Sequence, residues 1–245
     1  MLSLIKKFTR NFGFEIRRFD PKISESAQLM RQLAFHKVNL VLDVGANVGQ
    51  FGRKNLRDAG YQFQIISFEP LNAAWDKLLA EAAGDAHWTI APRMAIGAEN
   101  GEINIHVSQN SVSSSILDML PRHLESSPES AFVATERVPV RRLDSVIADY
   151  LKPDSRIFLK IDTQGYEGPA LEGADGILDR VVGIQLELSL VHLYSGQSLY
   201  DEMISRLKRS GFDLWGVSTA FVDAQSGRTL QVDATFFRNN SGVTS

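Results

Sequence analysis

The chain has 245 residues, of which 44% are hydrophobic and none is cysteine. This length and apolar content suit one α/β domain with a complete core. The lack of cysteine excludes disulfides, thiolate metal sites and a cysteine nucleophile, and the net charge of −3 gives no overall attraction to nucleic acid. No run reaches the roughly 20 apolar residues of a spanning helix. We therefore expect a cytoplasmic protein that is not integral to a membrane.

Residues 1–35 are interpreted as an N-terminal extension that precedes the domain. Within it, residues 1–20 mix apolar and basic positions and lack the apolar stretch and cleavage site of a secretory signal. Two interpretations stay open for this segment. It forms an amphipathic helix that packs on the domain or on a second subunit, or it contacts the inner face of a membrane peripherally.

Residues 36–240 alternate strand-like apolar runs with helical segments, which is typical of a mostly parallel sheet with helices on both faces. The predicted strands are 40–44, 64–69, 88–91, 103–107, 157–162, 182–188, 212–218 and 234–238. The predicted helices are 50–59, 72–82, 143–150, 167–174 and 199–210. The last two strands flank a polar turn, which predicts an antiparallel hairpin at the sheet edge. Residues 241–245 are a short tail.

Residues 108–136 interrupt this alternation and form a predicted insertion. The insertion begins with a serine-rich polar tract at 108–115 and contains Pro121 and Pro128. Loops of this length in compact domains are lids, binding loops or solvated segments. A lid over cofactor and acceptor, with Asn110 and the serines offering hydrogen bonds, and a solvated linker both stay open.

The first candidate site follows the apolar run Leu40–Leu42. The run ends in Asp43 and breaks into Gly45-Ala46-Asn47-Val48-Gly49 before a predicted helix begins, a pattern typical of a nucleotide-cofactor cradle. Glu69 ends the next predicted strand, where a carboxylate can accept both hydroxyls of a ribose. These two pieces predict an adenosine-type ligand.

The glycine spacing discriminates between adenosine-type ligands. A dinucleotide site has three glycines, G-x-G-x-x-G, at a helix N-terminus, whereas this turn has only Gly45 and Gly49. Asp43 would repel a pyrophosphate and attract the cationic amino-acid moiety of S-adenosylmethionine. The pattern favours S-adenosylmethionine and leaves an NAD-dependent oxidoreductase as the weaker alternative. A purely structural alternative for Asp43 is that it caps the following helix and binds no ligand.

A second charged group accompanies the apolar run 157–161. Lys160 lies inside this run, Asp162 follows it, and Glu187 lies at the end of the next run. The carboxyl ends of parallel strands form the ligand-binding edge of an open sheet, so all three are candidate catalytic residues. A buried lysine needs a carboxylate partner, and a structural ion pair is therefore an alternative. Two carboxylates alone are weak evidence for a divalent cation, and we predict no metal ligand.

His192 is the candidate general base. Its ordinary pKa lies close to neutral pH, which suits a group that accepts a proton from a hydroxyl. A lone histidine is also commonly a structural residue, and this alternative stays open.

Together these motifs resemble the FkbM-type methyltransferases. The resemblance rests on Asp43–Gln50, Phe68–Pro70, Arg142–Asp144 and Leu159–Glu167, with further support from Glu187, Leu193–Gly196, Gly211–Phe212 and Asp233–Phe237. It implies a class I methyltransferase fold, which is Rossmann-like, with S-adenosylmethionine as the donor. It also implies a hydroxyl acceptor on a sugar, glycolipid or secondary metabolite.

The resemblance implies a role for each part of the first site. Asp43, Gly45 and Gly49, with Ala46 and Asn47 of the same turn, would line the methionine and ribose side of the cofactor. Glu69 would hold the ribose hydroxyls, and the turn that contains Ala95 would approach adenine. Asp162 would lie beside the departing methyl group and face the acceptor.

Two further alternatives stay open beside an O-methyltransferase. One is a methyltransferase-like binding or scaffold protein that keeps the fold without turnover. The other is a nucleic-acid methyltransferase, which is disfavoured because no basic groove is visible and the Asn/Asp-Pro-aromatic signature is absent near Asp162. We therefore expect a small-molecule or glycan acceptor and no nucleic-acid partner. Formation of a homo-oligomer is left open.

Overall fold

The computed structural model describes residues 8–9, 11–14, 20, 22 and 24–239. Most of the predicted segment 1–20 and all of the tail 241–245 lie outside the described residues. Within the described part, no helix is long and apolar enough to cross a membrane.

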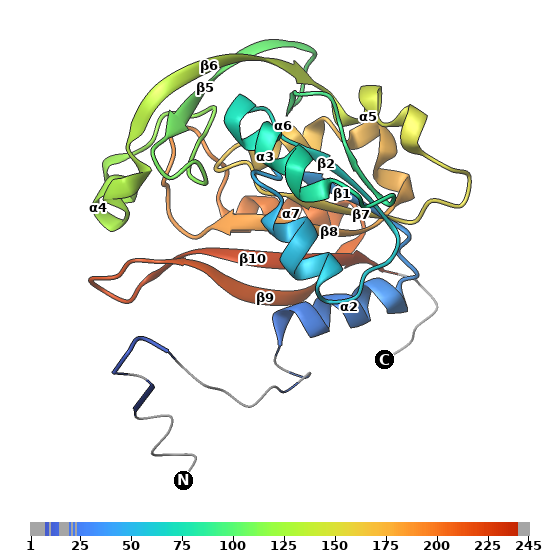
Figure 1. The fold of residues 1–245 in the computed structure, drawn as a ribbon, viewed down its shortest axis with the longest axis horizontal. Coiled ribbons are helices and arrows are strands. Elements are labelled where there is room, and N and C mark those ends of the chain that lie inside the picture. Colours follow the sequence, from blue (N-terminus) through green and yellow to red (C-terminus); the bar gives the residue numbers. More distant parts are fainter. Residues whose placement is uncertain (1–7, 10, 15–19, 21, 23, 240–245) are drawn as a thin grey trace.

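A seven-stranded sheet forms the centre of the molecule, in the order β3-β2-β1-β7-β8-β10-β9 (Figure 1). Its strands are β1 (Leu40–Val44), β2 (Gln64–Phe68), β3 (Trp88–Ile90), β7 (Ile157–Ile161), β8 (Val181–Ser189), β9 (Phe212–Val222) and β10 (Thr229–Arg238). The first five strands in this order pair in parallel, and β10 is antiparallel to both β8 and β9. The predicted sheet and its terminal antiparallel hairpin are confirmed.

Helices cover both faces of this sheet. One face carries α2 (Glu25–Phe35), the π-helix η1 (Phe51–Arg57) and α3 (Asn72–Ala82), and the other carries α5 (Leu143–Val146), α6 (Glu167–Glu172) and α7 (Tyr200–Arg209). Strand alternation sets this division: Val41 packs with the first group of helices, whereas Leu40 and Leu42 pack with the second. Short turns of 3-10 helix, η3 (Ala148–Tyr150) and η4 (Asp175–Arg180), complete the second face.

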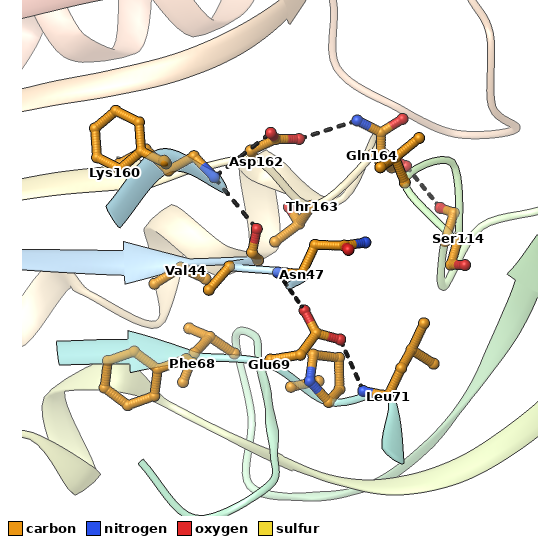
Figure 2. A pocket seen from close by; sticks show the side chains of 18 of the residues that line it. Val44, Asn47, Phe68, Glu69, Leu71, Ser114, Lys160, Asp162, Thr163 and Gln164 are labelled. Carbon is orange, nitrogen blue, oxygen red and sulfur yellow. Dashed lines mark hydrogen bonds and ion pairs between the residues drawn. The ribbon is translucent and has the colours of Figure 1, made fainter. Parts of the chain in front are cut away.

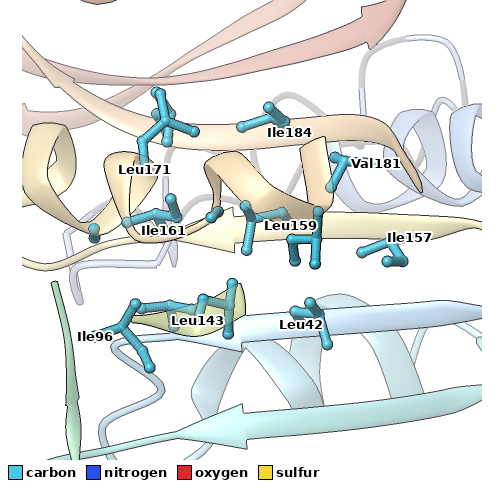
Figure 3. Packing of buried hydrophobic residues seen from close by; sticks show 14 of the residues in the cluster. Leu42, Ile96, Leu143, Ile157, Leu159, Ile161, Leu171, Val181 and Ile184 are labelled. Carbon is cyan, nitrogen blue, oxygen red and sulfur yellow. The ribbon is translucent and has the colours of Figure 1, made fainter. Parts of the chain in front are cut away.

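The core is continuous across the central strands. Every residue of β1 and β7 is buried, as expected for parallel strands covered on both faces. Figure 3 shows Leu42, Leu159 and Ile184 packed between the sheet and the helices of one face. Asp43 and Lys160 are charged exceptions within these apolar strands, and they are partners in the β1–β7 register.

Helix α2 belongs to this packing although the sequence analysis assigned it to the N-terminal extension. It begins after Ser24, whose Oγ accepts a hydrogen bond from the Ala27 amide at 3.5 Å. Leu29 and Leu33 are buried in the cluster that also contains Val41. Residues of α2 therefore bury apolar surface against the sheet.

A separate three-stranded sheet departs from the prediction for residues 103–136. It contains β4 (Ala95–Ile96), β5 (Gly101–Ser108) and β6 (Phe132–Arg141), in the order β4-β6-β5, and it arches over one end of the main sheet (Figure 1). The predicted strand 103–107 therefore lies in this second sheet, and residues 132–136 are part of β6. The insertion also holds α4 (Pro121–Ser126) and η2 (Pro128–Ser130).

Candidate active site

A cavity of about 310 Å³ opens at the carboxyl edge of the main sheet. It is bordered by the turn after β1, the end of β2, residues 94–96, the serine-rich segment 111–116 and the turn after β7 (Figure 2). In open parallel sheets this edge is the ligand-binding position. The structure thus brings both predicted centres to one cavity.

The turn after β1 is fixed by backbone contacts. Gly45 has φ of +75°, and a Cβ built on it would lie 1.8 Å from the Asp162 carbonyl oxygen, so only glycine fits. The amides of Gly45 and Ala46 both donate to the Phe68 carbonyl at 3.1 Å. These contacts hold Gly45, Ala46 and Asn47 along the cavity wall.

Gly49 has a different role from that implied for it. It does not line the cavity, and a Cβ there would lie 3.0 Å from Leu78 and 3.2 Å from Trp88. This glycine allows η1 to pack closely on α3 and β3, which is a structural function at the end of the turn.

Glu69 lines the cavity with its carboxylate already held by the backbone (Figure 2). The Asn47 amide donates to Oε2 and the Leu71 amide donates to Oε1, each at 2.8 Å. Burial raises the pKa of Glu69 to about 7, although both amides oppose this shift. Each carboxylate oxygen has a second lone pair, so Glu69 can still accept hydrogen bonds from ribose hydroxyls.

Asp43 does not reach the cavity, which corrects the expectation that it lines the methionine side of the ligand. It is fully buried, and the Lys160 ammonium lies 3.2 Å from its Oδ1, which has no hydrogen-bond partner among the described residues. Ser67 donates to its Oδ2 at 3.3 Å. Lys160 therefore separates Asp43 from the cavity, and Asp43 acts by holding this lysine.

Lys160 links the two centres. Its Nζ lies 3.5 Å from Oδ2 of Asp162 and donates to the Gly45 carbonyl at 3.2 Å. Burial lowers the pKa of Lys160, but Asp43 and Asp162 outweigh that effect and raise it above its ordinary value. Burial raises the pKa of Asp43, against the opposing effect of the ammonium. The two carboxylates thus favour the charged form of this lysine, which lines the cavity.

Asp162 lies in the cavity wall with 34% of its side chain exposed. Gln164, at φ of +52°, donates from Nε2 to Oδ1 of Asp162 at 2.9 Å and to Oε2 of Glu187 at 2.8 Å. Tyr194, which is fully buried, donates to the Gln164 Oε1 at 3.0 Å. Gln164 was not singled out from the sequence, because its partner Tyr194 is distant in the chain.

Glu187 stands behind Gln164 and does not line the cavity. Its pKa is raised well above the ordinary value by burial and by the nearby Asp162, Glu167 and Asp233 carboxylates. The Gln164 amide nitrogen joins the Glu187 and Asp162 carboxylates. This arrangement accounts for two neighbouring carboxylates without a cation, and no group of three or more metal-ligating side chains occurs among the described residues.

His192 is not brought to this cavity. Its side chain is exposed, whereas the flanking Val191 and Leu193 are buried. The alternation of the chain therefore directs the histidine to solvent. The structure gives no support for His192 as the general base, and of the two predicted catalytic carboxylates, Asp162 and Glu187, only Asp162 lines the cavity.

The serine-rich segment contacts the turn after β7. Ser115 donates to the Gln164 carbonyl at 2.6 Å, and the Asn47 amide group donates to Ser111 Oγ at 3.4 Å. Asn110 instead donates within the insertion, to Ser113 and Ser130, each at 3.1 Å. The insertion thus forms one wall of the cavity through its serines.

Several lining residues were not singled out from the sequence. Ala95 was predicted and lines the cavity together with Met94 and Ile96, whereas Asn55, Gln185 and Asp233 on the opposite side were not predicted. Burial, followed by the charge of Asp162, raises the pKa of Asp233 to about 6. The position of Asp233 between the apolar Val232 and Ala234 could have indicated this site, because burying a carboxylate in an apolar strand is costly unless it is paired or functional.

The family of the chain follows from a match to the methyltransferase FkbM domain over residues 43–214. This range covers more than half of the chain and contains both centres described above. The chain belongs to the FkbM methyltransferase family. This FkbM protein is therefore an S-adenosylmethionine-dependent methyltransferase.

Solved structures also resemble this FkbM methyltransferase. A putative O-methyltransferase from Klebsiella pneumoniae has 12% identity and a TM-score of 0.49, with 97% of this chain and 89% of that chain covered. Magnesium protoporphyrin IX methyltransferase from Synechocystis with bound SAH has 9% identity and a TM-score of 0.48, with 98% and 100% covered. A comparison with curated proteins gave no match.

Proposed function

We propose that this methyltransferase transfers the methyl group of S-adenosylmethionine to a hydroxyl of a sugar, glycolipid or secondary-metabolite acceptor. The observation that carries the proposal is the position of Asp162. Its partly exposed carboxylate lies in the same cavity as the Gly45 turn and the Glu69 carboxylate. A proton acceptor and a ribose-binding group therefore share one ligand space.

The lining of the cavity fits the proposed donor. Glu69 would hold the ribose hydroxyls, residues 94–96 would contact adenine, and the amide-rich turn at Gly45 would border the amino-acid part. The charged residues of the lining are three carboxylates, Glu69, Asp162 and Asp233, and one lysine, which favours a cationic ligand. When bound, S-adenosylmethionine supplies an electrophilic methyl group on a positively charged sulfur.

Asp162 would act on the acceptor hydroxyl. As the hydroxyl oxygen forms its bond to the methyl carbon, the carbon–sulfur bond breaks with its electron pair left on sulfur, and the hydroxyl proton passes to the Asp162 carboxylate. Lys160 and Gln164 hold that carboxylate from two sides, at 3.5 and 2.9 Å. Positioning supplies much of the rate in such a displacement, and the carboxylate removes the proton.

The same lining supports a hydroxyl-bearing acceptor over a nucleic acid. Among the described residues it contains serines and side-chain amides, and its one cation, Lys160, is already paired with Asp43 and Asp162, so it offers hydrogen bonds and no unpaired cation for a phosphate backbone. A scaffold protein without turnover would bind the donor and transfer nothing.

The first test is titration calorimetry with S-adenosylmethionine, followed by transfer of its isotopically labelled methyl group to a panel of hydroxylated sugars and polyketides. Asp162→Asn should lower kcat by about 10²- to 10⁴-fold and leave donor affinity nearly unchanged. His192→Asn is the matched control and should retain full activity. Donor binding with no transfer to any acceptor would favour the scaffold alternative, and a loss confined to the His192 variant would overturn the role of Asp162.

A further inference from the structure

A second hollow continues the active-site cavity along helix α2. It has a volume of about 390 Å³ and lies between α2 and the strands β9 and β10, which run side by side in Figure 1. Asn55, Gln185 and Asp233 line both this groove and the cavity. The two spaces are therefore adjacent, separated by no more than these three side chains.

The groove, which we call the α2 groove, is polar, and its described lining residues carry no positive charge. Its lining consists of Glu25, Gln28, Leu29, Gln32, Asn55, Gln185, Gly216, Val217, Ser218, Thr219, Asp233 and Thr235. Most of these side chains are amides or hydroxyls, and the only charged ones are two carboxylates. Such a surface repels phosphate, sulfate and carboxylate groups and exposes little apolar area to a lipid chain.

One hydrogen-bonding group in this groove is left without a partner in the described part of the protein. The Oε1 atom of Gln185 is buried at the junction and has no hydrogen-bond partner among the described residues. An unsatisfied buried polar group destabilises the folded chain, and a ligand hydroxyl that donates to this oxygen would remove that cost. Gly216 leaves room beside Gln32, because a Cβ there would lie 3.7 Å from the Gln32 Nε2.

We propose that the α2 groove binds the glycosyl or polyol part of the acceptor, a neutral chain rich in hydroxyls. Amide and carboxylate side chains match hydroxyl groups because each hydroxyl both donates and accepts a hydrogen bond. A chain bound here passes Gln185 and Asp233 and presents one hydroxyl to Asp162. This inference rests on the proposed methyl transfer and defines the chemical class of its acceptor.

The test uses the full chain, labelled with a fluorophore and saturated with S-adenosylhomocysteine, on an array of neutral, phosphorylated, sulfated and sialylated glycans. Binding should be confined to neutral glycans. Thr219→Arg places a bulky cation in the groove and should reduce that binding by at least about tenfold. Ala220→Arg is the matched control, since Ala220 is the exposed neighbour on the same strand and does not line the groove; it should bind as the parent does.

Gln32→Lys, with Ala34→Lys as its control on α2, repeats the test if the strand variant fails to fold. Binding of anionic glycans, unchanged binding by both groove variants, or no glycan binding at all would overturn the inference. A change from dimer to monomer in Thr219→Arg, measured by sedimentation, would identify the groove as a subunit interface and overturn it as well. Calorimetry with S-adenosylmethionine on the same proteins separates the two proposals. If the parent binds the donor and transfers methyl groups but binds no glycan, only the inference about the groove is overturned. If the parent does not bind the donor, the proposed function is overturned.

Discussion

The two sides of the active site differ in how their polar groups are satisfied. On the β1–β2 side, both oxygens of Glu69 accept backbone amides, and Lys160 is held by Asp43 and by the Gly45 carbonyl. On the β8–β10 side, Oε1 of Gln185 is buried without a hydrogen-bond partner among the described residues. The polar groups of the first side are therefore satisfied by folding, whereas the second side retains an acceptor that a ligand can satisfy. Substitutions on the first side should affect stability and donor binding together.

The largest effect is expected from Lys160→Met. This change leaves the fully buried Asp43 carboxylate without its cation, which should lower the free energy of unfolding by about 3–5 kcal/mol. Urea denaturation at neutral pH measures the loss. The double variant Asp43→Asn/Lys160→Met removes both charges and should recover most of the stability. A loss below about 1 kcal/mol in the single variant would show that the pair is not charged in the native state.

A somewhat smaller effect is expected from Gly45→Ala. The new Cβ would lie 1.8 Å from the Asp162 carbonyl oxygen, and the alanine would have to keep the positive φ of Gly45. We therefore expect the free energy of unfolding to fall by about 2–4 kcal/mol and donor binding to weaken. Gly84→Ala is the matched control, because Gly84 has φ of +84° and nothing within 4 Å of its would-be Cβ. Thermal unfolding of both variants separates the cost of the close contact from the cost of the backbone strain. Equal losses of stability in the two variants would contradict the close contact at Gly45.

The smallest effect concerns the pH dependence of ribose binding. The pKa of Glu69 is raised to about 7, so this carboxyl is mostly protonated one unit below that value and mostly ionised one unit above it. Only the ionised form accepts hydrogen bonds at both oxygens. The affinity for adenosine, a probe without the titrating amino group of the cofactor, should therefore rise about tenfold across this range.

Calorimetry with adenosine at several pH values measures this rise. In Glu69→Gln the affinity should be lower and independent of pH across the same range. A pH-dependent rise that persists in the glutamine variant would assign the titration to a group other than Glu69.

Much of the fold is encoded locally. The strand 40–44 and the helix 72–82 were predicted with the bounds that the structure has, because a buried parallel strand and an amphipathic helix both leave clear apolar patterns. Strand β6 (Phe132–Arg141) was not predicted at all. It pairs with β5 outside the main core and is largely exposed in its first half, so burial imposes no clear alternation there.

The site was predictable where strand ends determine it and not where distant loops do. Glu69 and Asp162 follow apolar strands, and the topology of a parallel sheet brings such residues to one edge. Gln164 became important only through its turn and its contact with Tyr194. His192 had suitable chemistry, but its direction depends on which neighbours are buried, and this is set by tertiary packing.

An arm, residues 101–140, carries the serine-rich wall of the cavity, and this arm leaves and rejoins the domain at one place. Gly101 at the start of β5 and Val140 near the end of β6 are partners in register, and Val140 also pairs with Ala95 of β4. A segment whose two ends lie together can be lengthened, shortened or replaced without changing the path of the chain around it. Over evolutionary time this arm can therefore be exchanged between relatives as a unit, and new acceptor shapes can be acquired while the order of the seven strands is inherited unchanged.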